Sequence, residues 1–241
     1  MVRNRHTLHF HDAEQGSEDW YRARRGRVTG SKCAPLLADP GKGRDGLSVG
    51  CWTLVYSLAA DIIRGHDHPV DPSGSYESSA MARGSRLEPH ARRAYALAEF
   101  EIVREVGFCE VVGRLAGFSA DLLVGRADEP LTKGAEIKCL ELKAHLAAID
   151  DDKIKPEHLA QIEWSMFCGG LTSWDLVHFS PELDRDRGGL HVETFTPDPV
   201  KQERFAEALP LVEKAVWRVV EKYGPPGAME GLTLQPVREH P

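Results

Sequence analysis

The middle of the chain constrains the fold most, because its apolar residues are spaced as in strands and not as in surface helices. Short apolar runs that end at glycine or turn-forming residues cover 101–112, 116–124 and 135–142. Apolar side chains follow one another in these runs more closely than on an amphipathic helix, as is typical of buried strands. The spacing predicts a three-stranded meander, with residues 128–130 as the turn before its last strand.

Helical spacing is found on both sides of these runs. Apolar residues recur on one side of a helix over residues 51–64, and further helices are predicted over 78–100, 156–168 and 200–223. Two short helices are expected on either side of Gly26, because serine and threonine stand where they can cap them.

Two further strands are predicted over residues 173–179 and 190–195. The resulting order is helices, sheet, helix, strands and helix. This order favours an α/β fold, of the α+β kind, with a mixed sheet flanked by helices.

The composition fits one globular domain. Of the 241 residues, 41% are hydrophobic and 28% are charged, which supplies a core and excludes a disordered or fibrous chain. No apolar run approaches the roughly 18 residues of a membrane span, and no secretory signal is recognisable. We expect a single domain over 1–241, with a catalytic core at about 15–180, a C-terminal strand and helix over 190–223 and a tail over 224–241.

The five cysteines are far apart and form no CxxC pair, so the sequence predicts neither a disulfide framework nor a structural zinc site. A reducing cytoplasm is the expected setting. Three histidines near the start, His6, His9 and His11, are better explained by an exposed N-terminal strand than by a metal site.

Charge has to be considered locally. With 30 Lys+Arg against 37 Asp+Glu the formal net charge is −7, which argues against nonspecific coating of nucleic acid. Residues 21–32 nevertheless carry five cations and no acid. Guanidinium groups with hydroxyls at a helix start suit a phosphate. A solvated basic helix face is the alternative.

Two carboxylates and a lysine fall on the last two strands of the predicted meander. If these strands form a hairpin, Asp121 lies beside Glu136, and Lys138 points to the same face. Magnesium binds one or two carboxylates and keeps several waters, while a nearby lysine can polarise an attacking water. Such a group is suited to phosphodiester hydrolysis.

The spacing of an acid two residues before a lysine is weak evidence by itself. It occurs three times, at Glu136/Lys138, Glu141/Lys143 and Asp151/Lys153. Only the first pair encloses an apolar residue in a strand-like setting and follows a strand that supplies another acid. A surface ion pair remains the alternative.

Five blocks, taken in chain order, carry a more specific pattern. They are Gln15–Trp20 with Arg24 and Thr29–Ser31, Gly84–Glu88, Ser119–Asp121, Glu136–Cys139, and Gln161–Met166. Together they resemble the YqaJ-like viral recombinases, the bacteriophage lambda exonuclease family within the PD-(D/E)xK nucleases. The C-terminal third carries little of the resemblance.

The resemblance implies a restriction-endonuclease-like core and a Mg²⁺-dependent 5′-to-3′ exonuclease on double-stranded DNA ends, with two metal ions that Mn²⁺ can replace. The implied metal ligands are Asp121, Glu136 and the main-chain carbonyl of Ile137, with Glu88 as a further acid. The implied catalytic lysine is Lys138, and the implied water-associated glutamine is Gln161. The implied contacts to the 5′-phosphate are Arg24, Ser31 and Ser119. Without the resemblance, Glu88 would be a solvated surface acid and Gln161 an ordinary helix residue.

The resemblance also implies partners. We expect a toroidal homotrimer around DNA, 3′ overhangs passed to a single-strand annealing protein, and a phage or prophage gene expressed in the bacterial cytoplasm. Two rival hypotheses are a restriction-like endonuclease and a non-catalytic DNA-binding subunit.

The chain departs from the family pattern at three positions. Leu140 replaces a usual proline, His158 a common tyrosine and Glu163 a frequent second glutamine. None of these changes removes an implied metal ligand. His145, seven residues after Lys138, is a further candidate neighbour of the site.

Overall fold

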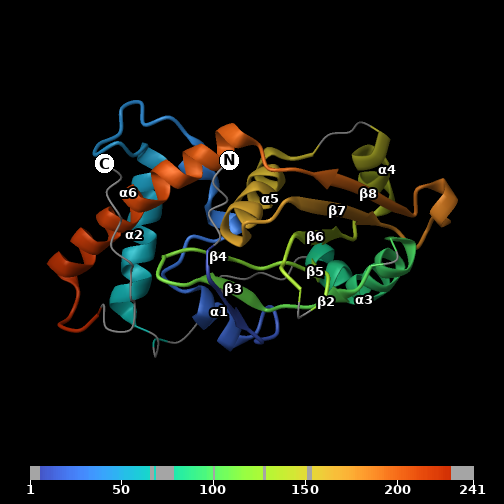
Figure 1. Cartoon of the computed structure of the whole chain (residues 1–241), viewed down its shortest axis with the longest axis horizontal. Coiled ribbons are helices and arrows are strands. Elements are labelled where there is room, and N and C mark those ends of the chain that lie inside the picture. Colours follow the sequence, from blue (N-terminus) through green and yellow to red (C-terminus); the bar gives the residue numbers. More distant parts are fainter. Residues whose placement is uncertain are drawn as a thin grey trace.

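The computed structural model describes residues 6–65, 68, 79–99, 101–126, 129–150 and 154–228. Two β-sheets with helices packed around them form this part of the chain (Figure 1). The strands are β1 Leu8–His11, β2 Val103–Arg104, β3 Phe108–Val111, β4 Gly117–Phe118, β5 Leu122–Val124, β6 Lys133–Lys138, β7 Ser173–Phe179 and β8 Leu190–Phe195. The α-helices are α1 Glu18–Arg24, α2 Val49–Arg64, α3 Ser79–Glu99, α4 Leu142–Asp150, α5 Pro156–Gly169 and α6 Pro199–Tyr223. The 3₁₀-helices are η1 Gly30–Lys32, η2 Ala34–Leu37 and η4 Arg185–Arg187.

The expected single meander is wrong in its connectivity. Its first run contains β2 and β3, and its second contains β4 and β5. The smaller sheet has the order β1-β3-β4 and the larger one β2-β5-β6-β7-β8, so each run changes sheets midway. In the first run the change occurs at Gly107, where a Cβ would collide with the main chain of His11 and Ala13. The hairpin between the last two runs is present as the antiparallel pair β5–β6. Of the expected turn, Asp128 lies outside the described residues.

The other predicted elements are found with small changes of boundary. The helices predicted over 51–64, 156–168 and 200–223 correspond to α2, α5 and α6, and both late strands have the predicted bounds. The helix predicted over 78–100 is α3, although its two predicted end residues lie outside the described part. Of the two short helices around Gly26, the first is α1, capped by Ser17, whereas the second is the 3₁₀-helix η1. Helix α4 was not predicted.

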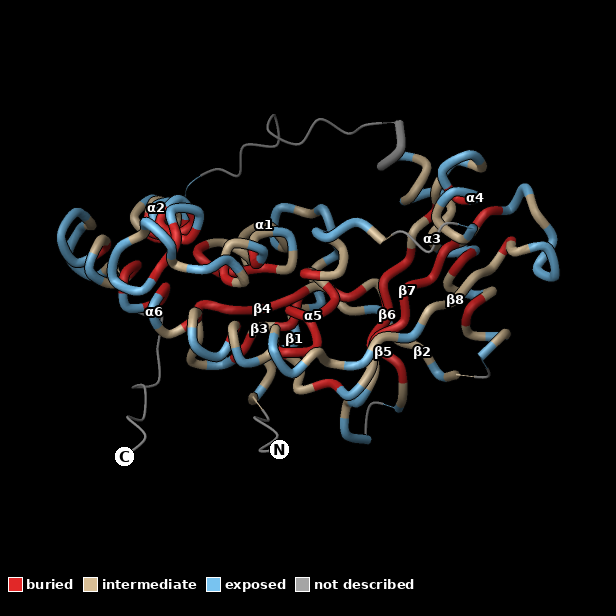
Figure 2. The backbone as a smooth tube through the Cα atoms, turned by 90° about the horizontal axis from the view of Figure 1, so that it is seen from above, coloured by how far each residue is buried: buried red, intermediate tan, exposed pale blue. Residues whose placement is uncertain are grey.

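The larger sheet is mixed because α4 and α5 form a crossover between β6 and β7, which pair in parallel. Alternate residues of its strands point to opposite faces. Leu123 and Leu176 belong to the main core with α2, α5 and α6, whereas Leu122 and Val177 pack in a second core that includes Tyr95 of α3. Figure 2 shows the buried segments along β4, β6 and β7, with exposed helix surfaces outside.

Helix α6 is tied to the smaller sheet by a buried ion pair. Glu213 of α6 is only 4% exposed and accepts hydrogen bonds from Nε of Arg114 at 3.0 Å and from the main-chain N–H of Leu115 at 2.9 Å. Nη2 of Arg114 lies 2.9 Å from the same carboxylate. Burial raises the pKa of Glu213 above its usual value, although Arg114 opposes this shift. The pair holds the long C-terminal helix on the turn between β3 and β4.

Within the described part of the chain, no helix combines the length and apolar character needed to cross a membrane. The five cysteines are all free and buried.

Candidate active site

The β5–β6 hairpin brings two predicted acids together. Leu122 is paired with Ala135, so the next residues outward, Asp121 and Glu136, are neighbours. Oδ2 of Asp121 accepts a hydrogen bond from the main-chain N–H of Ile137 at 2.6 Å. Burial, then Glu136, then Glu88 raise the pKa of Asp121 well above its usual value. The carboxylates of Asp121, Glu136 and Glu88 therefore repel one another at a position that is partly shielded from water.

Lys138 lies against the same carboxylates. Its Nζ donates to Oε1 of Glu136 at 2.6 Å. Burial alone would lower the pKa of Lys138, but Glu136, Asp121 and Glu88 together raise it above the ordinary value. The side chain is therefore an ammonium ion at neutral pH. It can offset negative charge on a phosphate or orient a water molecule.

Two helices supply the remaining polar groups. Gln161 of α5 points its Nε2 at both carboxylate oxygens of Glu136, at 3.3 Å from each. Glu88 of α3 accepts from Nη2 of Arg92 at 2.6 Å, a pairing that balances its charge at the edge of the site. The structure thus assembles Asp121, Glu136, Lys138, Gln161 and Glu88, which we call the carboxylate cluster.

The donor set of this cluster suits a hard divalent cation. Two carboxylates and the carbonyl of Ile137 offer oxygen ligands only, and a cation would relieve the repulsion that raises the pKa of Asp121. Among the described residues, however, no three His, Cys, Asp or Glu side chains already have the arrangement of a metal centre. Glu136 is engaged by Lys138 and Gln161 instead. Metal binding would therefore have to share or replace these contacts.

A second group of predicted residues gathers beside the first. Nη1 of Arg24 donates to Oγ of Ser119 at 3.0 Å, across 95 residues of sequence. The guanidinium lies over the ring of Trp20, 3.9 Å from its centroid. Burial lowers the pKa of Arg24 to about 10, while Tyr21 and Glu136 oppose the shift, so the group stays charged at neutral pH. We call Trp20, Arg24, Thr29, Ser31 and Ser119 the arginine cluster.

Hydroxyl groups complete the arginine cluster. Nε1 of Trp20 also donates to Oγ of Ser119, at 3.0 Å, so this oxygen accepts from two donors and its own hydrogen is left for an outside acceptor. Oγ1 of Thr29 lies 3.3 Å from Oγ of Ser31 and 3.5 Å from Nη2 of Arg24. A guanidinium group and neighbouring hydroxyl groups suit the binding of a phosphate. Trp20 and Thr29 were not singled out from the sequence, although both lie in the matching blocks.

Other residues considered in the sequence lie outside the two clusters. Nε2 of His145 is 2.7 Å from the carbonyl oxygen of Gly188, and its ring packs 6.4 Å from that of His178. His9 and His11 belong to strand β1, as expected, and Nε2 of His11 pairs with Glu110 at 3.0 Å. We find no contact that assigns any of them a part in catalysis.

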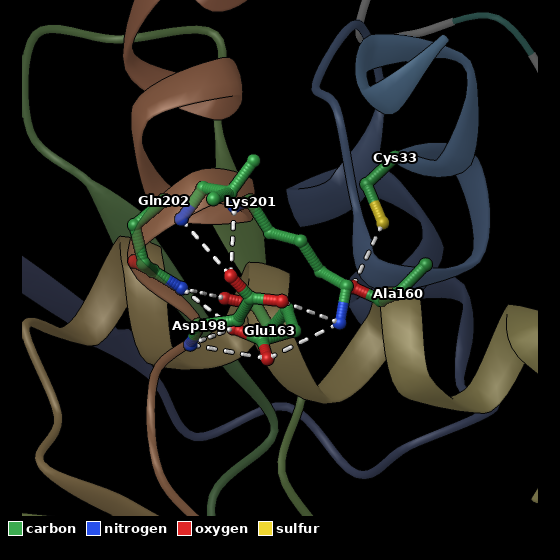
Figure 3. A network of polar contacts seen from close by, with 7 residues as sticks. Cys33, Ala160, Glu163, Asp198, Lys201 and Gln202 are labelled. Carbon is green, nitrogen blue, oxygen red and sulfur yellow. Dashed lines mark hydrogen bonds and ion pairs between the residues drawn. The ribbon is translucent and has the colours of Figure 1, made fainter.

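The three positions that depart from the family pattern lie in the following surroundings. The carboxylate of Glu163 turns away from the carboxylate cluster and accepts from the main-chain N–H of Asp198 and from Nε2 of Gln202, at 3.1 and 2.9 Å (Figure 3). The carbonyl of Leu140 accepts from Arg83 at 3.2 Å. His158 is half-buried, and burial together with Lys138 lowers its pKa.

Comparisons with known proteins identify the family of the chain and solved structures with a similar fold. The model of the YqaJ-like viral recombinase domain matches residues 19–172. The alkaline exonuclease LHK-Exo from Laribacter hongkongensis is 28% identical, with a TM-score of 0.63, over 86% of this chain and 94% of that one. Its complex with dAMP gives a TM-score of 0.62 at the same identity and coverage. A phage-related exonuclease from Haemophilus somnus, 12% identical with a TM-score of 0.54, covers 81% of this chain and 96% of that one and shows the fold alone. No curated protein matches.

The fold and the carboxylate cluster define a nuclease with the restriction-endonuclease-like core that was expected. The chain belongs to the YqaJ-like viral recombinase family, and the matched residues 19–172 include every residue of both clusters.

Proposed function

We propose that this protein is a Mg²⁺-dependent 5′-to-3′ exonuclease that degrades one strand of double-stranded DNA from its end. One observation carries the proposal: the arginine cluster and the carboxylate cluster are joined by the continuous segment Ser119-Ala120-Asp121. A phosphate held by the first cluster places the next phosphodiester beside the second. An endonuclease would have no need for a terminal phosphate seat at this position.

The arginine cluster would bind the terminal 5′-phosphate. Arg24 supplies charge and two N–H groups, while Ser119 and Ser31 supply hydroxyls. The ring of Trp20 fixes the guanidinium from one side, so little side-chain freedom is lost when the phosphate binds. The arginine cluster would therefore orient the DNA strand so that its 5′-phosphate lies against Arg24.

The carboxylate cluster would carry out hydrolysis. Lys138 orients a water molecule whose oxygen attacks phosphorus, and the bond from phosphorus to the 3′-oxygen of the terminal nucleotide breaks. The attacking water gives up one proton to solvent, and the leaving 3′-oxygen takes up one proton from solvent. Gln161 helps to fix the position of Glu136. Two Mg²⁺ ions, or Mn²⁺ in their place, would be held by Asp121, Glu136 and the carbonyl of Ile137, with Glu88 nearby, and would supply charge stabilisation. The remaining strand again ends in a 5′-phosphate, ready for the arginine cluster.

The family and its relatives also support a proposal about the assembly and the partners of the protein. LHK-Exo binds dAMP, a deoxynucleotide of the kind that an exonuclease releases. We further propose that the protein acts as a toroidal homotrimer in the bacterial cytoplasm and leaves 3′ overhangs for a single-strand annealing protein. Enclosure of the duplex would keep a chain with net charge −7 on its substrate.

Digestion of DNA tests the proposal. Linear duplexes with a 5′-phosphate or a 5′-hydroxyl, and closed circles, are incubated with Mg²⁺ or with EDTA. We expect shortening of linear DNA from phosphorylated ends in Mg²⁺ only, with circles left intact. Cutting of circles would favour the endonuclease, and binding without any cutting would favour the non-catalytic subunit.

Replacement of Arg24 with alanine is expected to reduce selectivity for the 5′-phosphate. Loss of charged hydrogen bonds should lower kcat/KM on phosphorylated ends by about 10- to 100-fold and leave activity on 5′-hydroxyl ends nearly unchanged. Steady-state rates on the two duplexes measure this. Arg22→Ala is the matched control, because Arg22 lies on the same helix but pairs with Glu18 and Asp19 at the surface. An equal loss on both kinds of end would contradict the assignment.

A further inference from the structure

Gly30 lies against the side chain of Gln161, and the contact leaves no room for a Cβ. An ideal Cβ on Gly30 would be 2.7 Å from Cγ and 3.4 Å from Cδ of Gln161, and its three nearest heavy atoms all belong to Gln161. The backbone of Gly30, the first residue of η1, does not have the positive φ that favours glycine. Glycine at this position is therefore required by the neighbouring side chain and not by the turn.

The main chain around Gly30 cannot easily move away. Sγ of Cys33 lies 3.1 Å from the carbonyl oxygen of Gly30 and 3.3 Å from that of Ala160, so the thiol joins η1 to α5 next to the contact. Figure 3 shows Cys33 pointing at Ala160. Two residues before Gly30, Val28 is hydrogen-bonded to the main chain of Leu115 and Gly117, at 2.8 and 3.0 Å. Both ends of the segment are thus fixed to neighbours.

Helix α5 is held on its other side. Glu163, two residues after Gln161, binds the first turn of α6 through Asp198 and Gln202, as Figure 3 shows. Nε1 of Trp164 donates to the carbonyl of Gly117 at 2.9 Å. Since neither η1 nor α5 is free to shift, an added methyl group would have to be accommodated by rotation of the Gln161 side chain.

Rotation at Cγ of Gln161 would carry the amide away from Glu136. In the present position Nε2 contacts both carboxylate oxygens of Glu136 at 3.3 Å. We propose that Gly30 is a positioning residue, whose lack of a side chain seats Gln161 against Glu136. This inference rests on the proposed function, because it concerns the same carboxylate cluster. Two consecutive residues of η1 then have different roles: Gly30 positions Gln161, and Ser31 contributes to the arginine cluster.

A double-mutant cycle tests the inference. Gly30→Ala, Gln161→Ala and the double variant are compared by steady-state kinetics on a 5′-phosphorylated duplex. We expect Gly30→Ala to lower kcat about tenfold or more, as for a group displaced by about an ångström, with KM unchanged because the arginine cluster is intact. In the Gln161→Ala background the same change should have no further effect, because the alanine leaves room for the methyl group. Additive losses, or full activity of Gly30→Ala, would overturn the inference.

Two controls separate this role from folding and from the proposed function. Gly50→Ala adds a methyl group in α2, where it makes only ordinary contacts with Pro35 at 3.5 Å, and should leave kcat unchanged. If Gly30→Ala does not fold, the double variant should fold and match Gln161→Ala; failure of both would overturn the inference. The side-chain amide resonance of Gln161 in an NMR spectrum should shift in Gly30→Ala but not in Gly50→Ala. This readout remains valid even if the wild-type protein proves unable to digest DNA, and an unshifted resonance would contradict the inference.

Discussion

Replacing Lys138 with alanine is expected to reduce nuclease activity by about 10²- to 10⁴-fold, the usual contribution of a group that positions or transfers a proton in the transition state. Nζ of Lys138 is 2.6 Å from Glu136, and its raised pKa keeps the charge in place at neutral pH. Single-turnover digestion of a 5′-phosphorylated duplex in Mg²⁺ measures the loss. Binding of the same duplex should be retained, because the arginine cluster does not include Lys138.

Lys143→Ala is the matched control. Lys143 belongs to another acid-x-Lys pair of the sequence, but its side chain is exposed on α4. Its replacement should leave the rate unchanged. If Lys138→Ala were as active as Lys143→Ala, Lys138 would be no more than half of a surface ion pair, and the hydrolytic role proposed for the cluster would have to be abandoned.

Glu213→Ala should cause the largest loss of stability, about 2–4 kcal/mol in the free energy of unfolding, because the buried main-chain N–H of Leu115 and the partly buried guanidinium of Arg114 then lose their acceptor. The substitution leaves the guanidinium of Arg114 and the N–H of Leu115 without the carboxylate that binds both. Urea denaturation followed by circular dichroism gives the difference between variant and wild type.

Glu207→Ala serves as the comparison for Glu213, since Glu207 lies on the same helix but forms an exposed ion pair with Arg204 at 3.5 Å. It should change stability by less than about 1 kcal/mol. A loss at Glu213 as small as that at Glu207 would show that α6 is held by apolar packing alone.

The local pattern of the sequence was sufficient for the β5–β6 hairpin and for much of the carboxylate cluster. Side chains alternate along strands, so the spacing of Glu136 and Lys138 placed them on one face, and the hairpin brought Asp121 beside them. Strands β7 and β8 were predicted with their observed bounds because turn-forming residues frame each of them. These are features in which near neighbours decide the structure.

Features that depend on distant contacts could not be predicted in this way. The split of the first apolar run between two sheets depends on the approach of the N-terminal segment to Gly107, and no residue near Gly107 in the sequence indicates this approach. Glu163 was weighed only as a departure from the family pattern, whereas its partners lie 35 and 39 residues away in α6. The resemblance to a family implied that Arg24 and Ser119 both contact the 5′-phosphate, and no spacing rule would have suggested that these two residues lie close together.

The chain passes from the smaller sheet to the larger one at Ala120, and this short connection limits the length of the nucleotide product that each cleavage would release. Ala120 is fully buried and its carbonyl accepts from Gln15 at 2.9 Å, so Ser119 and Asp121 cannot drift apart. Two residues of extended chain span at most about 7 Å. Under the proposed function, the terminal phosphate would bind at one end of this short span and the bond to be cut would lie at the other, so the segment would fix the distance between them. Each cycle should release a mononucleotide, whatever the base, and dinucleotides should be absent from the digest.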